Sequence, residues 1–169
     1  PLLLQQSPDL VITVDNGISS IRGVQMLQDR GIKVLVTDHH LPGEELPAAD
    51  VIVNPNCVGD AFASKNLAGV GVIFYVMCAL RRHALNHQWF ATHNIEPPNM
   101  GQFLDLVALG TVADVVPLDY NNRILVHQGL QRMRAGTARP GIAALLRIAG
   151  RNPEKLSAAD LGFAVGPRL

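Results

Sequence analysis

The 169-residue sequence contains few cysteines, no excess of either charge and no long apolar run. Cys57 and Cys78 lie far apart and match no metal-ligand spacing, which favours two reduced thiols in a cytoplasmic protein over a disulfide. Acidic and basic residues number 14 each, so the net charge gives no indication of a nucleic-acid partner. The most apolar run, residues 68–80, is too short to cross a bilayer, and the first residues show no signal-peptide pattern. We therefore expect a cytoplasmic protein with no membrane partner.

The composition is that of a folded domain, because 48% of the residues are hydrophobic and 17% are charged. The chain starts at Pro1 rather than at a methionine, and it stops on Leu169 without a polar tail. We therefore expect residues 1–169 to form one domain that is cut at both ends.

The pattern of apolar residues predicts an α/β fold with a parallel sheet, flanking helices and a mainly helical C-terminal half. Three short β-branched segments predict buried strands at residues 9–15, 33–38 and 49–55. A helical pattern that follows Ser19 and Ser20 and ends at Gly31 joins the first two, which makes a β-α-β unit with parallel strands. Further helices are predicted at residues 68–86, 101–112, 123–135, 141–149 and 158–163.

Two aspartates follow neighbouring strands of this unit. Asp15 and Asp38 each come directly after an apolar strand. The carboxyl ends of adjacent parallel strands meet at one edge of the sheet, where open α/β sheets bind ligands. We therefore expect the two carboxylates to converge there. Asn16-Gly17 is also a common hairpin-turn signal, and this alternative stays open, although a helical pattern follows it.

Two adjacent imidazoles, His39 and His40, follow Asp38. Carboxylate oxygen together with imidazole nitrogen suits Mn²⁺, Fe²⁺ or Zn²⁺ better than Ca²⁺. Neighbouring side chains of an extended backbone point apart, so we expect one imidazole to bind a metal while the other faces substrate. A bridging carboxylate at Asp15 would suit two metal ions about 3.5–4 Å apart, the arrangement that clamps both oxygens in phosphoryl transfer. The alternative is a solvated loop with an Asx turn.

Three residues beyond the predicted strands are further candidates. Asp114 is a lone acid within an apolar segment, where a carboxylate is destabilising unless it is paired or metal-bound; the alternative is an exposed carboxylate at a helix end. Gly69 and Gly71 precede or begin a helix, where backbone N–H groups could hold a phosphate. Close helix packing explains the two glycines equally well.

In their order along the chain, these segments resemble those of the DHH phosphoesterases. The matching stretches are TVDNGISS, VLVTDHHLPGEELPAADVIVNPN, NLAGVGVIFYV, LVALGTVADVVPL and LGFAVGPRL. The last of them favours the RecJ branch, the single-strand-specific 5′→3′ exonucleases. The resemblance covers nearly the whole chain.

The resemblance implies a role for each matching residue. Asp15 would be the carboxylate that bridges two divalent ions, Mn²⁺ or Mg²⁺, and His39 and Asp114 would be further metal ligands. His40 would contact substrate phosphate or act as a second imidazole ligand. Asp38 would be either a ligand or a partner that orients a histidine.

The substrate side is implied in the same way. Arg168, together with Gly69 and Gly71, would approach the phosphates of single-stranded DNA, the implied partner. The parent protein would be a nuclease of DNA repair and recombination.

One motif of the family has no match. The family begins with an Asp-rich motif, D-x-D-x-D-G, and has a second domain downstream; we expect both to lie outside residues 1–169. We therefore expect this chain alone to be inactive and to hold one metal ion or none. Two alternatives stay open: a DHH phosphodiesterase that acts on short oligonucleotides or cyclic dinucleotides, and a non-catalytic DHH-like interaction module.

Overall fold

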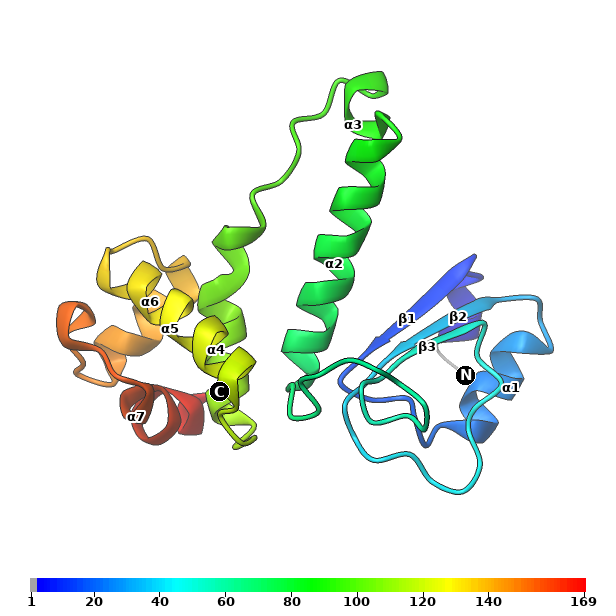
Figure 1. The fold of residues 1–169 in the computed structure, drawn as a ribbon, viewed down its shortest axis with the longest axis horizontal. Coiled ribbons are helices and arrows are strands. Elements are labelled where there is room, and N and C mark those ends of the chain that lie inside the picture. The colour runs from blue at the N-terminus through cyan, green and yellow to red at the C-terminus, as the bar shows by residue number, and fades with distance from the viewer. Residues whose placement is uncertain (1–2) are drawn as a thin grey trace. The chain divides into compact units, whose positions relative to one another are not determined.

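The computed structural model describes residues 3–169, which fall into two compact units that meet in the sequence at Val72 and Ile73 (Figure 1). Within residues 3–169, the first unit contains a parallel sheet, one complete α-helix, a short 3-10 turn and the first turn of α2, and the second unit contains only helices and helical turns. This confirms the expected α/β class and the mainly helical C-terminal half.

The sheet of the first unit has three parallel strands in the order β1-β2-β3. Their bounds are β1 Leu10–Val14, β2 Lys33–Thr37 and β3 Val51–Val53, and a short 3-10 turn at Leu3–Gln6 precedes them. Val14 is paired with Thr37, and Thr37 with Val53, so the three strands end side by side. The residues that follow them are therefore brought to one edge of the sheet.

Helix α1 (Ile21–Gln28) connects β1 to β2 and covers one face of the sheet (Figure 1). Its Val24 packs against Val34 and Val36 of β2, and all three side chains are buried. Ser20 occupies the N-cap position, and its side chain makes no capping hydrogen bond. Gly31 has a φ of +72°, the left-handed conformation that commonly follows a helix end.

The remaining elements are helical. They are α2 Gly69–Asn86, α3 Trp89–Thr92, η2 Met100–Phe103, α4 Leu104–Ala113, α5 Tyr120–Arg134, α6 Pro140–Ile148, η3 Pro153–Lys155, α7 Ala158–Asp160, η4 Leu161–Val165 and η5 Gly166–Arg168. Helix α4 lies along α5, where Gly129 has no side chain and lets the backbone of Leu104 approach closely. Met133, Leu146 and Leu161 are fully buried in the core of the second unit.

The predicted helices are present, with three differences. Helix α5 begins at Tyr120 rather than at residue 123, because the Asp119 side chain caps it by accepting a hydrogen bond from the Asn122 N–H. The helix predicted at 158–163 is one turn of α-helix that continues as a π-turn and a 3-10 turn. Helix α3, a single turn, was not predicted.

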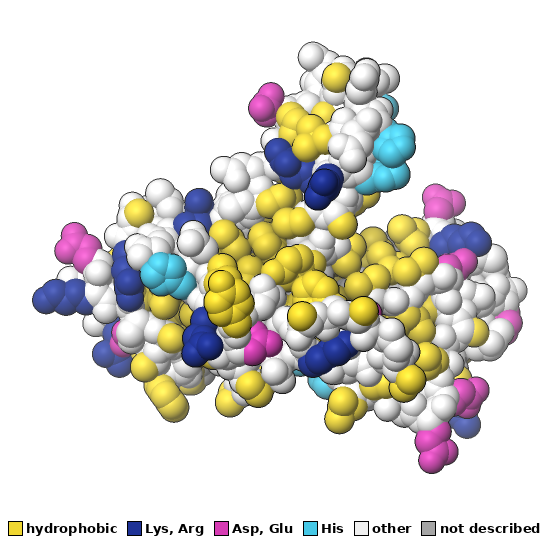
Figure 2. Space-filling view, in the orientation of Figure 1, with side chains coloured by type: hydrophobic (Ala, Val, Ile, Leu, Met, Phe, Trp, Pro, Cys, Tyr) yellow, Lys and Arg dark blue, Asp and Glu magenta, His cyan; other side chains and the backbone are white. Residues whose placement is uncertain are grey.

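Apolar side chains also reach the surface of the described residues, mixed with charged ones (Figure 2). Among residues 3–169, no helix combines the length and the apolarity that crossing a bilayer requires.

Candidate metal centre

The first component of the site is Asp15, the residue directly after β1. Its N–H donates to the Thr37 carbonyl oxygen at 3.0 Å and so extends the ladder by one residue. Its φ is then +65°, a left-handed conformation that aspartate tolerates better than most side chains. The Thr13 hydroxyl donates to the Asn16 carbonyl oxygen at 2.7 Å and holds the turn. The Asp-Asn-Gly segment is therefore a turn, but one that leads out of a parallel strand rather than round a hairpin.

Gly69, the first residue of α2, leaves room for the Asp15 carboxylate. A Cβ at position 69 would overlap the carboxylate group itself. The start of a helix carries partial positive charge, which favours a carboxylate there. Gly71 behaves differently, because a Cβ at this position would meet the Leu67 side chain. Its contacts support the packing explanation, and the phosphate role predicted for both glycines stays a prediction.

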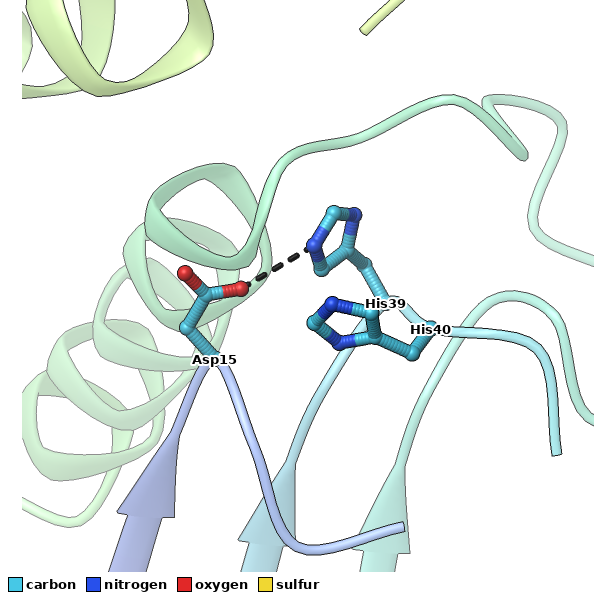
Figure 3. Close-up of side chains that lie close together, drawn as sticks. All are labelled: Asp15, His39 and His40. Carbon is cyan, nitrogen blue, oxygen red and sulfur yellow. Dashed lines mark ion pairs between the residues drawn. The ribbon is translucent and has the colours of Figure 1, made fainter. Parts of the chain in front are cut away.

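The two histidines after β2 lie beside this carboxylate (Figure 3). His39 Nε2 lies 3.0 Å from Asp15 Oδ1, and its side chain is 11% exposed. The His40 ring is 60% exposed and its centroid lies 4.4 Å from that of His39. One ligand atom from each of Asp15, His39 and His40 lies within 4.8 Å of the others, and within residues 3–169 no other group of three such side chains does so.

The expectation that the two imidazoles diverge is therefore wrong. The backbone at His39 and His40 is not extended, because it bends round the carboxylate of Asp38. Asp38 Oδ1 accepts hydrogen bonds from the N–H groups of both histidines, at 2.7 and 3.1 Å, and from His40 Nδ1 at 2.7 Å. Asp38 Oδ2 accepts from the Ile18 N–H at 2.9 Å. One buried carboxylate thus gathers both rings on the side of Asp15.

These hydrogen bonds also decide the charge of Asp38. Burial, at 1% exposure, acts to raise the pKa of the Asp38 carboxyl, but the hydrogen bonds from Ile18, the His40 ring and the two histidine N–H groups outweigh it. The pKa of Asp38 therefore lies below its usual value, and the group is a carboxylate at neutral pH. Because a carboxylate only accepts, His40 Nδ1 carries a proton, and in the neutral ring Nε2 has the lone pair that can bind a cation. In this geometry Asp38 orients a histidine.

Two asparagines that the sequence did not single out hold the other side of the same turn. Asn56 Nδ2 donates to the His39 carbonyl oxygen at 2.6 Å, and Asn54 Nδ2 donates to the His40 carbonyl oxygen at 2.8 Å. Asn54 is buried, at 2% exposure. The signal was present in the sequence, since Asn-Pro-Asn follows the third strand and so reaches the same sheet edge.

The other candidates belong to the second unit. Asp114 caps the C-terminal end of α4 and is exposed, so the argument from its burial is wrong. The buried acid of that segment is Asp105, which accepts from the Arg139 N–H at 2.8 Å. Arg168 donates to the Ala164 carbonyl oxygen one turn earlier. The metal role of Asp114 and the phosphate role of Arg168 stay predictions.

Other histidines gather on the second unit, over the end of α2 and over α3 (Figure 2). The rings of His83 and His87 lie 4.1 Å apart, and His93 stacks on Trp89 at 4.3 Å. All four side chains are exposed. These residues carry no carboxylate partner of the kind found beside His39.

The donor set of the first unit fits a divalent transition metal ion. One carboxylate oxygen and two imidazole nitrogens are ligands that Mn²⁺, Fe²⁺ and Zn²⁺ accept, whereas Ca²⁺ prefers oxygen alone. The half-exposed Asp15 side chain leaves the site open to water and substrate. The fold and the site thus define an α/β protein with a candidate divalent-metal centre at the carboxyl ends of parallel strands.

The chain belongs to the DHH family: residues 2–111 match the DHH family, N-terminal domain. It is 62% identical over 160 residues to the single-stranded-DNA-specific exonuclease RecJ of Salmonella typhimurium, covering 95% of this chain and 28% of that protein. It is 38% identical over 160 residues to RecJ of Bacillus subtilis, covering 95% of this chain and 18% of that protein. The chain thus spans less than a third of the length of these relatives.

Two solved structures share the fold. One is a crystal structure of exonuclease RecJ bound to manganese, with a TM-score of 0.76 and 33% identity over 99% of this chain and 39% of that chain. The other is RecJ of Thermus thermophilus in complex with Mn²⁺, with a TM-score of 0.75 and 31% identity over 99% of this chain and 23% of that chain. The recognition of a RecJ-like DHH domain is confirmed.

Proposed function

We propose that the protein is a metal-dependent exonuclease that hydrolyses phosphodiester bonds of single-stranded DNA. The observation that carries this proposal is the group formed by Asp15, His39 and His40, in a chain that is 62% identical to a single-stranded-DNA-specific exonuclease. DNA repair and recombination, in the cytoplasm, are the setting that such a nuclease would serve. The polarity of digestion, 5′→3′, rests on the resemblance to the RecJ branch.

Mn²⁺ or Mg²⁺ is the proposed cofactor, two ions in the complete site. The manganese bound by the two solved RecJ structures supports a divalent ion. The imidazole nitrogens favour Mn²⁺ over Mg²⁺, which prefers oxygen ligands. When bound, such ions stabilise negative charge on the phosphate and make a water molecule more nucleophilic.

The residues of this chain have separate tasks. Asp15 would hold metal through its carboxylate, and His39, whose Nε2 lies 3.0 Å from Asp15 Oδ1, would be the adjacent nitrogen ligand. His40 presents Nε2 from a ring that Asp38 holds through Nδ1, so it can ligate metal when the ring is neutral and donate to a phosphate oxygen when the ring is protonated. We propose Asp114 as a further ligand and Arg168 as a phosphate contact in the assembled site.

The test is an end-labelled cleavage assay with the full-length gene product. Purified protein is incubated with Mn²⁺ and with single-stranded DNA labelled at the 5′ or the 3′ end, beside duplex DNA and a cyclic dinucleotide. We expect a metal-dependent loss of single-stranded DNA that begins at the 5′ end, with little action on the other two substrates. The matched variant is Asp15→Asn, because asparagine keeps the left-handed backbone at that position.

Asp15→Asn should fold and should lose activity. Metal-dependent cleavage by this folded variant at the wild-type rate would contradict the assigned role of Asp15. Faster hydrolysis of the cyclic dinucleotide than of DNA would instead favour the phosphodiesterase alternative.

A further inference from the structure

We propose that Asn54 and Asn56 are positioning residues that set the orientation of the His39 and His40 imidazoles toward a divalent cation. The inference rests on the proposed function, because it concerns the same metal centre. Neither asparagine reaches the centre with its own side chain, since each donates its amide to a backbone carbonyl oxygen.

The first step is that side chains hydrogen-bond to the backbone of the histidine turn, which is formed by His39 and His40. The N–H groups of His39 and His40 both donate to the Asp38 carboxylate. The carbonyl oxygens of His39 and His40 accept from Asn56 and Asn54. Side chains thus bond to the N–H and the carbonyl oxygen of each histidine, where a strand or helix would use backbone bonds. Removal of one side chain therefore releases one side of a peptide group that carries a ligand.

The second step is that the two asparagines form one rigid unit. Asn54 Oδ1 accepts a hydrogen bond from the Asn56 N–H at 2.9 Å, which makes an Asx turn across Pro55. Lys65 Nζ donates to the Pro55 carbonyl oxygen at 2.6 Å and to the Asp60 carbonyl oxygen at 2.8 Å. Asn54 and Pro55 are buried. The turn after β3 is therefore held by hydrogen bonds other than those it makes to the histidines. It can act as a template for them.

The third step concerns the division between the two donors. Asn56 contacts the peptide of His39, the imidazole that lies beside Asp15. Asn54 contacts the peptide of His40, whose ring Asp38 already holds. Loss of the Asn56 amide should therefore disturb the metal centre more than loss of the Asn54 amide, because Asn56 holds the peptide of the imidazole that lies 3.0 Å from Asp15.

The variants are chosen to separate positioning from folding. Asn56→Ala removes the donor to His39. Asn54→Ser removes the donor to His40 while its hydroxyl can still accept the hydrogen bond that closes the turn. The matched control is Asn152→Ala, because Asn152 also precedes a proline and also accepts from the N–H two residues ahead, at 3.0 Å, but lies in the second unit.

Two readouts are measured on the full-length gene product. The first is the dissociation constant for Mn²⁺, followed by the electron paramagnetic resonance signal of the free ion. The second is the set of ring ¹⁵N chemical shifts of His39 and His40 in the metal-free protein at one fixed pH. We expect Asn56→Ala to raise the Mn²⁺ dissociation constant by about 10- to 100-fold, as loss of a partner that orients a ligand does elsewhere. Asn54→Ser should raise it by less.

The ring signals of both histidines should move in these two variants. The control Asn152→Ala should keep the wild-type affinity and ring signals even if its unfolding temperature falls. Wild-type affinity and unmoved ring signals in a folded Asn56→Ala protein would overturn the inference. If Asn54→Ser fails to fold, the Asn56→Ala variant still tests the inference, because Asn56 is less buried. A wild-type protein that binds Mn²⁺ but leaves single-stranded DNA intact would refute the proposed function alone, since both readouts would still report on positioning.

Discussion

The Asp15 carboxylate lies against Gly69, in the space that a side chain at the start of α2 would fill. The turn at Asp15 and the start of α2 are far apart in the sequence but in contact here. Because Gly69 has no side chain, the Asp15 carboxylate can occupy this position. The space that Gly69 leaves is therefore explained by the position of the Asp15 carboxylate rather than by the conformation of its own backbone, since its φ is not positive.

Gly69→Ala should impair the centre while α2 persists. The added methyl group must displace the Asp15 carboxylate, and a displacement of about 1 Å can lower a rate by about 100-fold. The control is Gly141→Ala in the first turn of α6, where a Cβ meets nothing within 4 Å and alanine should be neutral or stabilising. Nuclease rate and Mn²⁺ affinity are measured for both. Equal activity of the two variants would show that Asp15 has room to move.

His39 and His40 should respond differently to substitution. His39→Gln should raise the Mn²⁺ dissociation constant more, because His39 Nε2 lies beside Asp15 and its ring is largely buried. His40→Gln should lower kcat more than it lowers Mn²⁺ affinity, because the exposed His40 ring can face substrate. Titration with Mn²⁺ and steady-state kinetics measure the two effects. An equal loss of Mn²⁺ binding in both variants would contradict the assignment of metal binding to His39 and substrate contact to His40.

Asp38→Asn should destabilise the histidine turn in a pH-dependent way. Both carboxylate oxygens of Asp38 accept hydrogen bonds from N–H groups, and asparagine would replace one of these oxygens with an NH₂ donor. The loss of this acceptor should lower the free energy of unfolding by about 2 kcal/mol. Because the pKa of Asp38 is lowered on folding, the carboxylate stabilises the fold above its unfolded pKa of about 3.9, and this contribution is lost as the pH falls through the folded value. The difference between the two proteins should therefore be largest at neutral pH.

Hydrogen exchange at the Ile18, His39 and His40 amides reports this difference locally. These amides should exchange faster in Asp38→Asn at pH 7, once the rates are corrected for the intrinsic effect of pH. A difference that grows below pH 4 would contradict the assigned sign.

Val115→Asn should stabilise the second unit. Val115 has a φ of +60°, a strained conformation for a β-branched residue, and it is 85% exposed, so little burial is lost on substitution. We expect a gain of about 1 kcal/mol in the free energy of unfolding. Val58→Asn is the control, because Val58 is fully exposed without a positive φ, and it should be neutral. Urea unfolding measures the free energy of unfolding of both variants. A lower value for Val115→Asn than for the wild type would contradict the claim that the backbone at Val115 is strained.

Residues 1–169 alone should show no nuclease activity. The group of Asp15, His39 and His40 supplies a single carboxylate, which is too little negative charge to hold two dications close together against their repulsion. One ion at low affinity, or none, is the expected stoichiometry. Calorimetric titration with Mn²⁺ and a cleavage assay test this, with Asp15→Asn as the matched control. Metal-dependent cleavage that disappears in Asp15→Asn would show that the site is complete within these residues.

The sequence was most informative where the hydrophobic pattern and the strand ends coincide. Parallel strands that end at Val14 and Thr37 made the position of Asp15 and the histidines predictable. The convergence of the two imidazoles was not predictable, because it depends on the hydrogen bonds that the Asp38 carboxylate accepts from both histidines. The rule that adjacent side chains of an extended backbone point apart predicted the opposite arrangement. Asp114 was misjudged for a related reason: an apolar neighbourhood in sequence does not reveal where a helix ends.

The contacts described above that orient Asp15, His39 and His40 come from residues 13–69. Asp15, its space at Gly69, the Asp38 carboxylate and the two asparagine donors thus form one continuous block of sequence. Exchange of this block as a single segment would keep Asp15, His39 and His40 together with the groups that orient them. A chimaera that replaces only part of the block would separate each imidazole from the side chains that orient it.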